Sequence, residues 1–254
     1  MMSIDHIVLA FLISGRLTGM ILMMPILGLS MFPALAKAFM LLGLTAVIFP
    51  TVPYNIGYLS FGETVIHIGM EFVLGALIGA MIMTIFHGLL TATEMMSTQI
   101  GQAAAKQFNP SMSISQSPIG GMALFLAMGV FMGNNQHLEM IQILAESFQY
   151  IPPTKIGSLQ DASMFYVQHT SIMFDLAIKI SAPVLLFVFL NNSFLAMLSK
   201  LAPNMNVFFS VGFQVSMMGG LVIFFLIIPH FLELSQILIQ EYMRYLLDIL
   251  ALAK

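Results

Sequence analysis

The sequence predicts an all-α integral membrane protein built from long, kinked helices and helical hairpins. Two observations on composition predict this class. Of the 254 residues, 59% are hydrophobic and only 7% are charged, against about 25% charged residues in an ordinary soluble domain. The mean hydropathy is +0.97. So few polar side chains cannot coat a globule of this size in water. The same numbers exclude a disordered chain, a nucleic-acid-binding protein and an ordinary soluble enzyme.

The third observation is the spacing of the charges. A helix that crosses a bilayer needs about 20 apolar residues, and uncharged windows near or above that length recur along the chain. These windows cover residues 17–36, 38–62, 72–93, 107–138, 180–199 and 201–232. We therefore expect five or six candidate membrane spans.

Taken in order, the apolar runs are interrupted. The first, Ile7–Leu29, contains Arg16; the second, Ala38–Val52, is short and is followed by Pro53. The third, Thr64–Ala92, contains Glu71 along with two histidines. Each charge near the centre of a lipid-facing helix costs at least about 2.5–3.5 kcal/mol.

These interruptions allow two interpretations. The chain is either a polytopic helical protein with kinks, or a subunit whose helices are covered mostly by other subunits. We favour the second, because broken helices are tolerated where neighbouring protein or water satisfies the backbone. Arg16, Glu71 and Glu94 are interpreted as structural ion partners or pore-side charges that must be paired if buried. Their pairing does not follow from the sequence.

The composition changes abruptly before the fourth apolar run, Ile119–Gly133, which is too short to span a bilayer. Residues 97–118 form the longest polar stretch, rich in Ser and Gln, with a turn signal at Asn109 and Pro110. One interpretation is a solvent-exposed loop. The other is a loop in an aqueous path, because irregular backbone survives at membrane depth in a water-filled cavity.

A second break, at residues 150–160, precedes a predicted helical hairpin. Its first arm is about Phe165–Leu201, its tip Ala202–Asn206, and its second arm about Val207–Leu247. Asp175 and Lys179 are four residues apart in the favourable acid-before-base order, which predicts an ordinary ion pair on the first arm.

Glycines spaced four apart favour close approach of helix backbones. Three such pairs occur in the apolar runs: Gly15 and Gly19, Gly75 and Gly79, and Gly129 and Gly133. Each pair is a candidate helix contact, although glycine is common in membrane helices for other reasons.

No constellation of residues points to catalysis, a cofactor or a metal. The six histidines form no HxH, HExxH or i, i+4 pair, and neither a GxSxG elbow nor a Gly-rich phosphate loop is present. Cysteine is absent, which excludes disulfides and thiolate metal sites. We expect no catalytic, cofactor-binding or metal-binding residue.

Several segments, in one order along nearly the whole chain, resemble the FliR/SctT family, the export-gate subunits of flagellar and injectisome type III secretion. The segments are Arg16–Pro25 with Pro33, Gln99–Gly101, Asn109 with Pro110, Ser115–Pro118, Ser147–Pro153, Leu201–Phe208, Val211–Val215 and Gly219–Leu221. The chain departs at Asn109, Gln214 and Ser216, where the family often has an acid or a base.

The resemblance implies that the chain folds within a multi-subunit helical export gate, most closely the flagellar one. Residues 1–155 would form a FliP-like pore-forming part, and residues 156–254 a FliQ-like hairpin. Partners would be several FliP-like and FliQ-like subunits, a FlhB-like subunit, and unfolded flagellar proteins in transit. The location would be the bacterial inner membrane at the flagellar basal body. The chain would catalyse nothing, since proton-motive force and a separate ATPase would supply the drive.

The resemblance also assigns residues. The polar loop, about residues 97–118, matches the family's channel plug, and Lys200, Pro203, Asn204 and Asn206 form the hairpin tip, a candidate for the cytoplasmic entrance. The plug or gating residues would be Gln107, Phe108, Asn109, Pro110, Ser111, Met112, Ser113, Ile114, Ser115, Gln116, Ser117 and Pro118.

Three alternatives stay open on the sequence. A secondary transporter or small-molecule channel would share broken helices and midplane charges, but predicts an inverted repeat that the two unlike halves do not display. An intramembrane enzyme would need a catalytic constellation of residues, and the chain lacks one. The injectisome counterpart differs from the flagellar subunit only weakly at this level.

Overall fold

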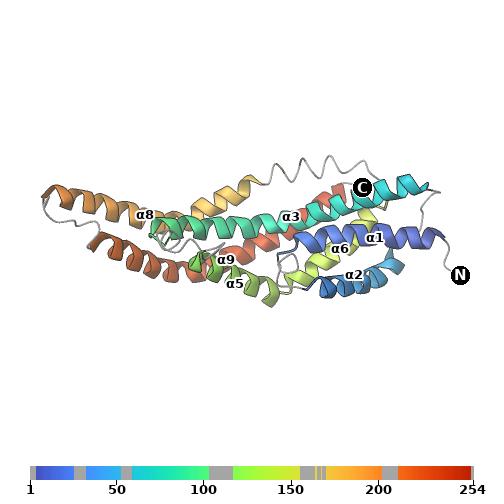
Figure 1. The fold of residues 1–254 in the computed structure, drawn as a ribbon, viewed down its shortest axis with the longest axis horizontal. Helices are drawn as coiled ribbons and strands as arrows, with labels where there is room; N and C mark the ends of the chain where they lie inside the picture. The colour runs from blue at the N-terminus through green and yellow to red at the C-terminus, as the bar shows by residue number, and fades with distance from the viewer. Residues whose placement is uncertain are drawn as a thin grey trace. The chain divides into compact units, whose positions relative to one another are not determined.

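A computed structural model describes residues 4–25, 33–52, 59–102, 117–154, 164, 167, 170–201 and 211–252. Every regular element in these ranges is a helix, and they contain no strand. This confirms the predicted all-α class. The elements are α1 (Ile4–Met23), α2 (Ala34–Ile48), the 3₁₀ turn η1 (Phe49–Thr51), α3 (Phe61–Gln99), α5 (Pro118–Gly133), α6 (Gln136–Tyr150), α8 (Ser171–Leu201) and α9 (Phe213–Leu252) (Figure 1).

Among the residues that the structure describes, five segments are long and apolar enough to cross a membrane, which agrees with the spans expected from the spacing of charges. They are Asp5–Met23, Ala34–Thr51, Phe61–Gln99, Ser171–Leu201 and Phe213–Tyr245. Helix α5 is a shorter apolar helix, as predicted for the fourth run. Two prolines lie inside helices, Pro183 in α8 and Pro229 in α9.

The chain divides into two compact units that are not continuous in sequence. Unit 1 comprises Met1–Thr84, Phe131–Ser171 and Ile237–Lys254, and unit 2 comprises Ile85–Val130 and Ile172–Gln236. Helices α3 and α9 therefore each contribute to both. This division rests on contacts within the fold. The predicted division at residues 155 and 156 rests on resemblance and stays a prediction.

In unit 1, α1 packs closely on the first half of α3 through two of the three predicted glycine pairs. A Cβ on Gly75 would overlap the carbonyl oxygen of Arg16, and a Cβ on Gly19 would overlap that of Phe72. Gly15 and Gly79 are also in contact with the opposite helix. The third pair is different, since a Cβ at Gly129 or Gly133 would meet no atom within 4 Å.

In unit 2, α8 lies beside α9 as the predicted hairpin (Figure 1). Gly212 and Gly219 of this second arm leave room for Leu195 and Phe187 of α8. The Nδ2 of Asn191 donates a hydrogen bond to the Oγ of Ser216 at 2.7 Å, which links the two arms across an otherwise apolar contact. The predicted tip, Ala202–Asn206, lies outside the described residues.

Helix α6 is an element that the sequence analysis did not isolate. Its buried residues, Gln136, Met140, Ile143, Leu144, Ser147 and Phe148, recur at the spacing of one helix face. A residue in the left-handed region, Asn135 with φ 57°, immediately precedes it. The helix ends at Tyr150, where the second break was predicted.

Candidate functional site

The most deeply buried charged side chain in the described residues is Arg16, in the middle of α1. It is 1% exposed. Its Nε donates to the Oε2 of Glu71 on α3 at 2.6 Å, so Glu71 is the ion partner that the sequence left open. Glu71 is itself 4% exposed. A buried pair of this kind must be satisfied on all sides, because taking two charges out of water costs several kcal/mol per ion.

The two terminal nitrogens of Arg16 each donate a hydrogen bond to a third helix or to the turn after it. Its Nη1 donates to the Oγ of Ser147 at 2.9 Å, and its Nη2 donates to the carbonyl of Ile151 at 3.0 Å. The guanidinium also lies over the ring of Phe148, 4.1 Å from the ring centroid. This is a cation–π contact in a desolvated setting.

The carboxylate of Glu71 holds the same turn from the other side. Its Oε1 accepts a hydrogen bond from the backbone N–H of Thr154 at 3.4 Å. Thr154 has a φ of 78°, a left-handed conformation that a residue with a side chain rarely adopts. We call Arg16, Glu71, Ser147, Phe148, Ile151 and Thr154 the Arg16 cluster. It joins α1, α3, α6 and the turn 151–154 of unit 1.

The last four members of the cluster were not predicted as site residues. The spacing of Ser147 and Phe148 on the apolar face of α6 was a usable signal for their burial. No feature of the sequence indicated that Ile151 and Thr154 would contribute backbone groups to the cluster. Because these donors and acceptors face each other at hydrogen-bonding distance, the geometry makes the cluster a structural clamp.

The polar segment predicted as a plug begins where α3 ends, and this end is well defined. The N–H of Gln102 donates to the carbonyl of Ser97, and the N–H of Gly101 donates to that of Thr98. With Gly101 at φ 93°, these two bonds form a Schellman motif. The start of α3 is equally defined by a capping box, in which Ser60 and Glu63 each accept the other's backbone N–H.

The other end of the polar segment is Ser117, the N-cap of α5. Its Oγ accepts the N–H of Gly120 at 3.0 Å, and Pro118 occupies the first helical position. The backbone N–H of Ser117 donates to the Oε1 of Glu94 on α3 at 2.7 Å. Both ends of the predicted plug are thus fixed at the carboxyl-terminal part of α3, within unit 2.

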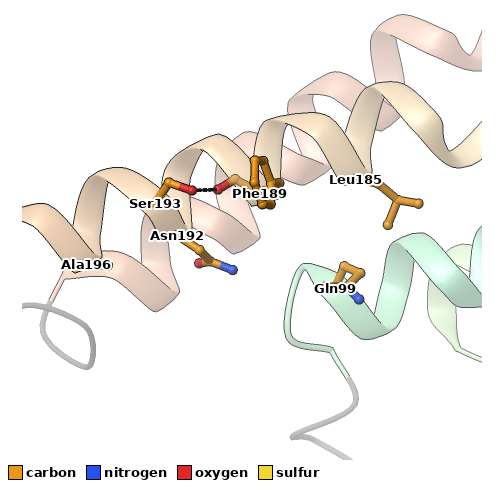
Figure 2. A pocket seen from close by; sticks show the side chains of 6 residues that line it. All are labelled: Gln99, Leu185, Phe189, Asn192, Ser193 and Ala196. Carbon is orange, nitrogen blue, oxygen red and sulfur yellow. Dashed lines mark hydrogen bonds between the residues drawn. The ribbon is translucent and has the colours of Figure 1, made fainter.

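A groove with a polar edge lies beside this end of α3. Its volume is about 540 Å³, and it lies between Gln99 of α3 and one face of α8 (Figure 2). Figure 2 shows Asn192 and Ser193 on the α8 side, where the Ser193 Oγ donates to the carbonyl of Phe189 at 2.9 Å. The remaining lining residues, Leu185 and Ala196, are apolar. Gln99, in the last turn of α3, is the lining residue that belongs to the predicted polar stretch.

The other predicted site residues lie apart from these features. Asp175 and Lys179 form the expected pair at 2.6 Å, with side chains 60% and 68% exposed. Lys200 lies exposed in the last turn of α8. Residues 107–116 of the predicted plug and Pro203, Asn204 and Asn206 of the predicted tip lie outside the described residues. In the part of the chain that the structure describes, no three His, Asp or Glu residues form a group able to hold a metal.

Comparison with known proteins places the chain in a sequence family. Residues 7–242 match the family described as Bacterial export proteins, family 1. A flagellar biosynthetic protein FliR of Caulobacter vibrioides is 26% identical over 209 residues, covering 80% of this chain and 82% of the relative. The Escherichia coli FliR is 22% identical, covering 93% and 90%. A Yop proteins translocation protein T of Yersinia pestis is 31% identical over 144 residues, covering 56% and 55%.

Proposed function

The chain belongs to the bacterial export proteins, family 1, and we infer that it is a core subunit of the flagellar type III protein export gate. Relatives that carry the flagellar name match along most of the chain. The five apolar segments agree with a membrane protein of that apparatus. We place it in the bacterial inner membrane at the flagellar basal body.

We propose that the chain lines the export channel and that its polar segment, centred on Gln107–Pro118, closes it. The observation that carries this proposal is the fixing of both ends of that segment at one part of α3. A segment whose ends are held together can block a passage without being part of the surrounding helices. Its Ser and Gln side chains make weak, exchangeable hydrogen bonds, so water or an exported chain can replace them at modest cost.

The proposed partners are several FliP-like and FliQ-like subunits, a FlhB-like subunit, and unfolded flagellar proteins in transit. Large apolar side chains that are exposed on α2, α8 and α9 support a need for such partners. The chain would act as part of a passage and carry out no chemistry. The Arg16 cluster would serve only to hold three of its helices together.

Co-purification from native membranes tests the assembly. We expect a stable complex in which this chain occurs once beside several copies of two other small membrane proteins. A monomeric, fully lipid-surrounded chain in membranes that still secrete flagellar proteins would overturn the proposal.

Solute leakage tests the closing role. Deleting residues 107–116, and keeping Ser117 and Pro118 so that α5 is still capped, should raise small-solute permeability in cells that overproduce the complete gate. Unchanged permeability with normal amounts of assembled gate would refute the role of this segment.

The injectisome counterpart is a second candidate, favoured by the 31% identity to the Yersinia translocation protein over 144 residues. Deleting the gene for this chain distinguishes the two. Loss of flagellar filaments supports the flagellar gate, whereas loss of injectisome secretion with normal filaments supports the counterpart.

A further inference from the structure

We propose that a groove between α1 and α2, in unit 1, binds an anionic phospholipid of the surrounding membrane. The groove has a volume of about 240 Å³. Thr18, Ile21 and Leu22 near the end of α1 form one wall, and residues 34–41 of α2 form the other. Pockets that enclose a compact ligand have volumes of about 300–1,000 Å³, so this smaller groove suits a thin acyl chain better.

The lining of the groove is apolar except at one residue of α2. Ala34, Ala38 and Leu41 lie along one face of that helix. On the α1 side, the Oγ1 of Thr18 donates to the carbonyl oxygen of Ser14 at 2.6 Å, which satisfies the hydroxyl within its own helix. The charged group that a ligand meets in the groove is therefore the ammonium of Lys37.

The position of Lys37 along α2 matches the shape of a phospholipid. Lys37 lies in the first turn of α2, at one end of the candidate membrane span Ala34–Thr51. The ends of a span lie at the depth of the lipid headgroups. Leu41, one turn further along the helix, lies deeper. A phosphate on Lys37 would thus leave an acyl chain to run inward along Ala38 and Leu41.

The electrostatic setting of Lys37 favours an anion. It is the only charged residue between Arg16 and Glu63. Helix α2 has no acidic residue in its first turn, and no side chain caps its start at Pro33. The N–H groups of such a helix start attract anions, so they add to the positive charge of the lysine. An ammonium carries three donors, which lets it hold a phosphate beside any contact within the chain.

The opposite face of α2 is a separate surface. Phe39 and Leu42 are exposed there and do not line the groove. Lipid tails are as apolar as these side chains, so a bilayer gives no hydrophobic reason to prefer one apolar surface over another. The headgroup contact alone distinguishes the groove. We therefore expect selection of anionic over zwitterionic lipid at the groove, and no such selection at the opposite face.

Photoactivatable lipids test the site on the full-length chain, purified in its assembled form from native membranes. The probes are phosphatidylglycerol and phosphatidylcholine that carry the same reactive group on one acyl chain, in nanodiscs that are otherwise alike. Mass spectrometry of the digested chain locates the labelled residues. We expect phosphatidylglycerol to label the groove about fivefold more than phosphatidylcholine, the ratio that one lysine near an anionic lipid contributes.

Substitutions at Lys37 test the headgroup contact. Lys37→Gln should abolish the preference, because its amide is uncharged, whereas Lys37→Arg should retain it. Lys179→Gln removes an exposed lysine of α8 and should leave the preference unchanged. All variants are compared at equal amounts of assembled protein. Equal labelling of the wild-type groove by the two lipids, or a preference that persists in Lys37→Gln, would overturn the proposal.

A matched pair of substitutions tests the acyl-chain contact. Ala38→Leu places a larger side chain in the groove and should reduce its labelling by both lipids. Ala36→Leu makes the same change at an exposed residue outside the lining, and its labelling should match the wild type. Equal labelling of the two variants would contradict the contact. A wild-type groove labelled by neither lipid in an intact assembly would show that a partner polypeptide fills it, which also overturns the proposal.

Discussion

At the scale of single residues, one buried arginine links three helices of unit 1. The hydrogen bonds of Arg16 reach two further helices and the turn after α6, and its partner Glu71 holds that turn as well. Removing one member of a buried pair leaves an uncompensated charge, which is far more costly than removing both.

This asymmetry predicts the outcome of substitutions at the pair. Arg16→Met should destabilise the assembled protein by about 3–5 kcal/mol, because the Glu71 carboxylate stays buried without its cation. The combination of Arg16→Met with Glu71→Leu should be less destabilised than Arg16→Met alone. Thermal unfolding of the purified gate in detergent, with each variant present at the same concentration, measures the difference.

Lys179→Met is the control for this test, because its pair with Asp175 is exposed and exposed pairs contribute little. We expect its midpoint to stay near that of the wild type. A double variant that loses as much stability as the two single variants summed would show that the members of the cluster act independently.

At the scale of elements, the contact between α1 and α3 is set by the absence of side chains. Gly19 and Gly75 bring the two backbones together, and this closeness places Arg16 within reach of Glu71. Without a hydrophobic driving force in lipid, such packing and interhelical hydrogen bonds hold membrane helices together.

Alanine substitutions at two glycines of α3 should distinguish the face that packs on α1 from the face that is open. Gly75→Ala should force α1 away from α3 and lower the amount of assembled protein in membranes, since its Cβ would overlap backbone. Gly69→Ala lies on the same helix, and a Cβ there would meet no atom within 4 Å. It should be tolerated, with a gain of about 0.5–1 kcal/mol in helix stability. Quantitative blotting of membranes measures both, and equal loss for both would contradict the packing.

The hairpin of α8 and α9 offers a second test at this scale. Asn191→Leu removes the donor of the hydrogen bond to Ser216 that links the two arms and should cost about 0.5–1.5 kcal/mol. Asn192→Leu, on the next residue and exposed, should cost less than half as much. Thermal midpoints of the purified gate compare the two. A larger loss for Asn192→Leu would point to a partner contact in the groove of Figure 2 in place of the link between the arms.

At the scale of the whole molecule, the described helices carry far more exposed apolar surface than a protein in water tolerates. The span Ala34–Thr51 is the extreme case, because only 6% of its residues are buried within the fold. Phe39 and Leu42 on this helix are each 66% exposed. Large exposed apolar patches mark interaction sites or lipid contact.

A photo-crosslinking amino acid at position 39 should therefore capture another polypeptide of the gate in native membranes. Placed instead at Phe86, which is 1% exposed, it should give only crosslinks within the chain. Both products are seen as mobility shifts on a denaturing gel. Adducts with lipid alone at position 39, in cells whose gate is assembled, would contradict coverage by a partner at this helix.

Composition and spacing by themselves determined the helical membrane class, the number of long spans and the break before α5. These properties follow from local hydrophobicity and turn chemistry, which act over a few neighbouring residues. The exposed pair of Asp175 and Lys179 was predictable for the same reason, because one helix turn sets its geometry.

The tertiary structure alone decided which charge meets which. Arg16 and Glu71 are 55 residues apart, and Arg16 and Ser147 are 131 apart. It also decided that Gly75 is packed while Gly129, in the same spacing pattern, is open. Patterns in neighbouring residues do not predict these long-range contacts, because the contacts depend on which helices pack against each other. That choice is made by the packing of the whole unit.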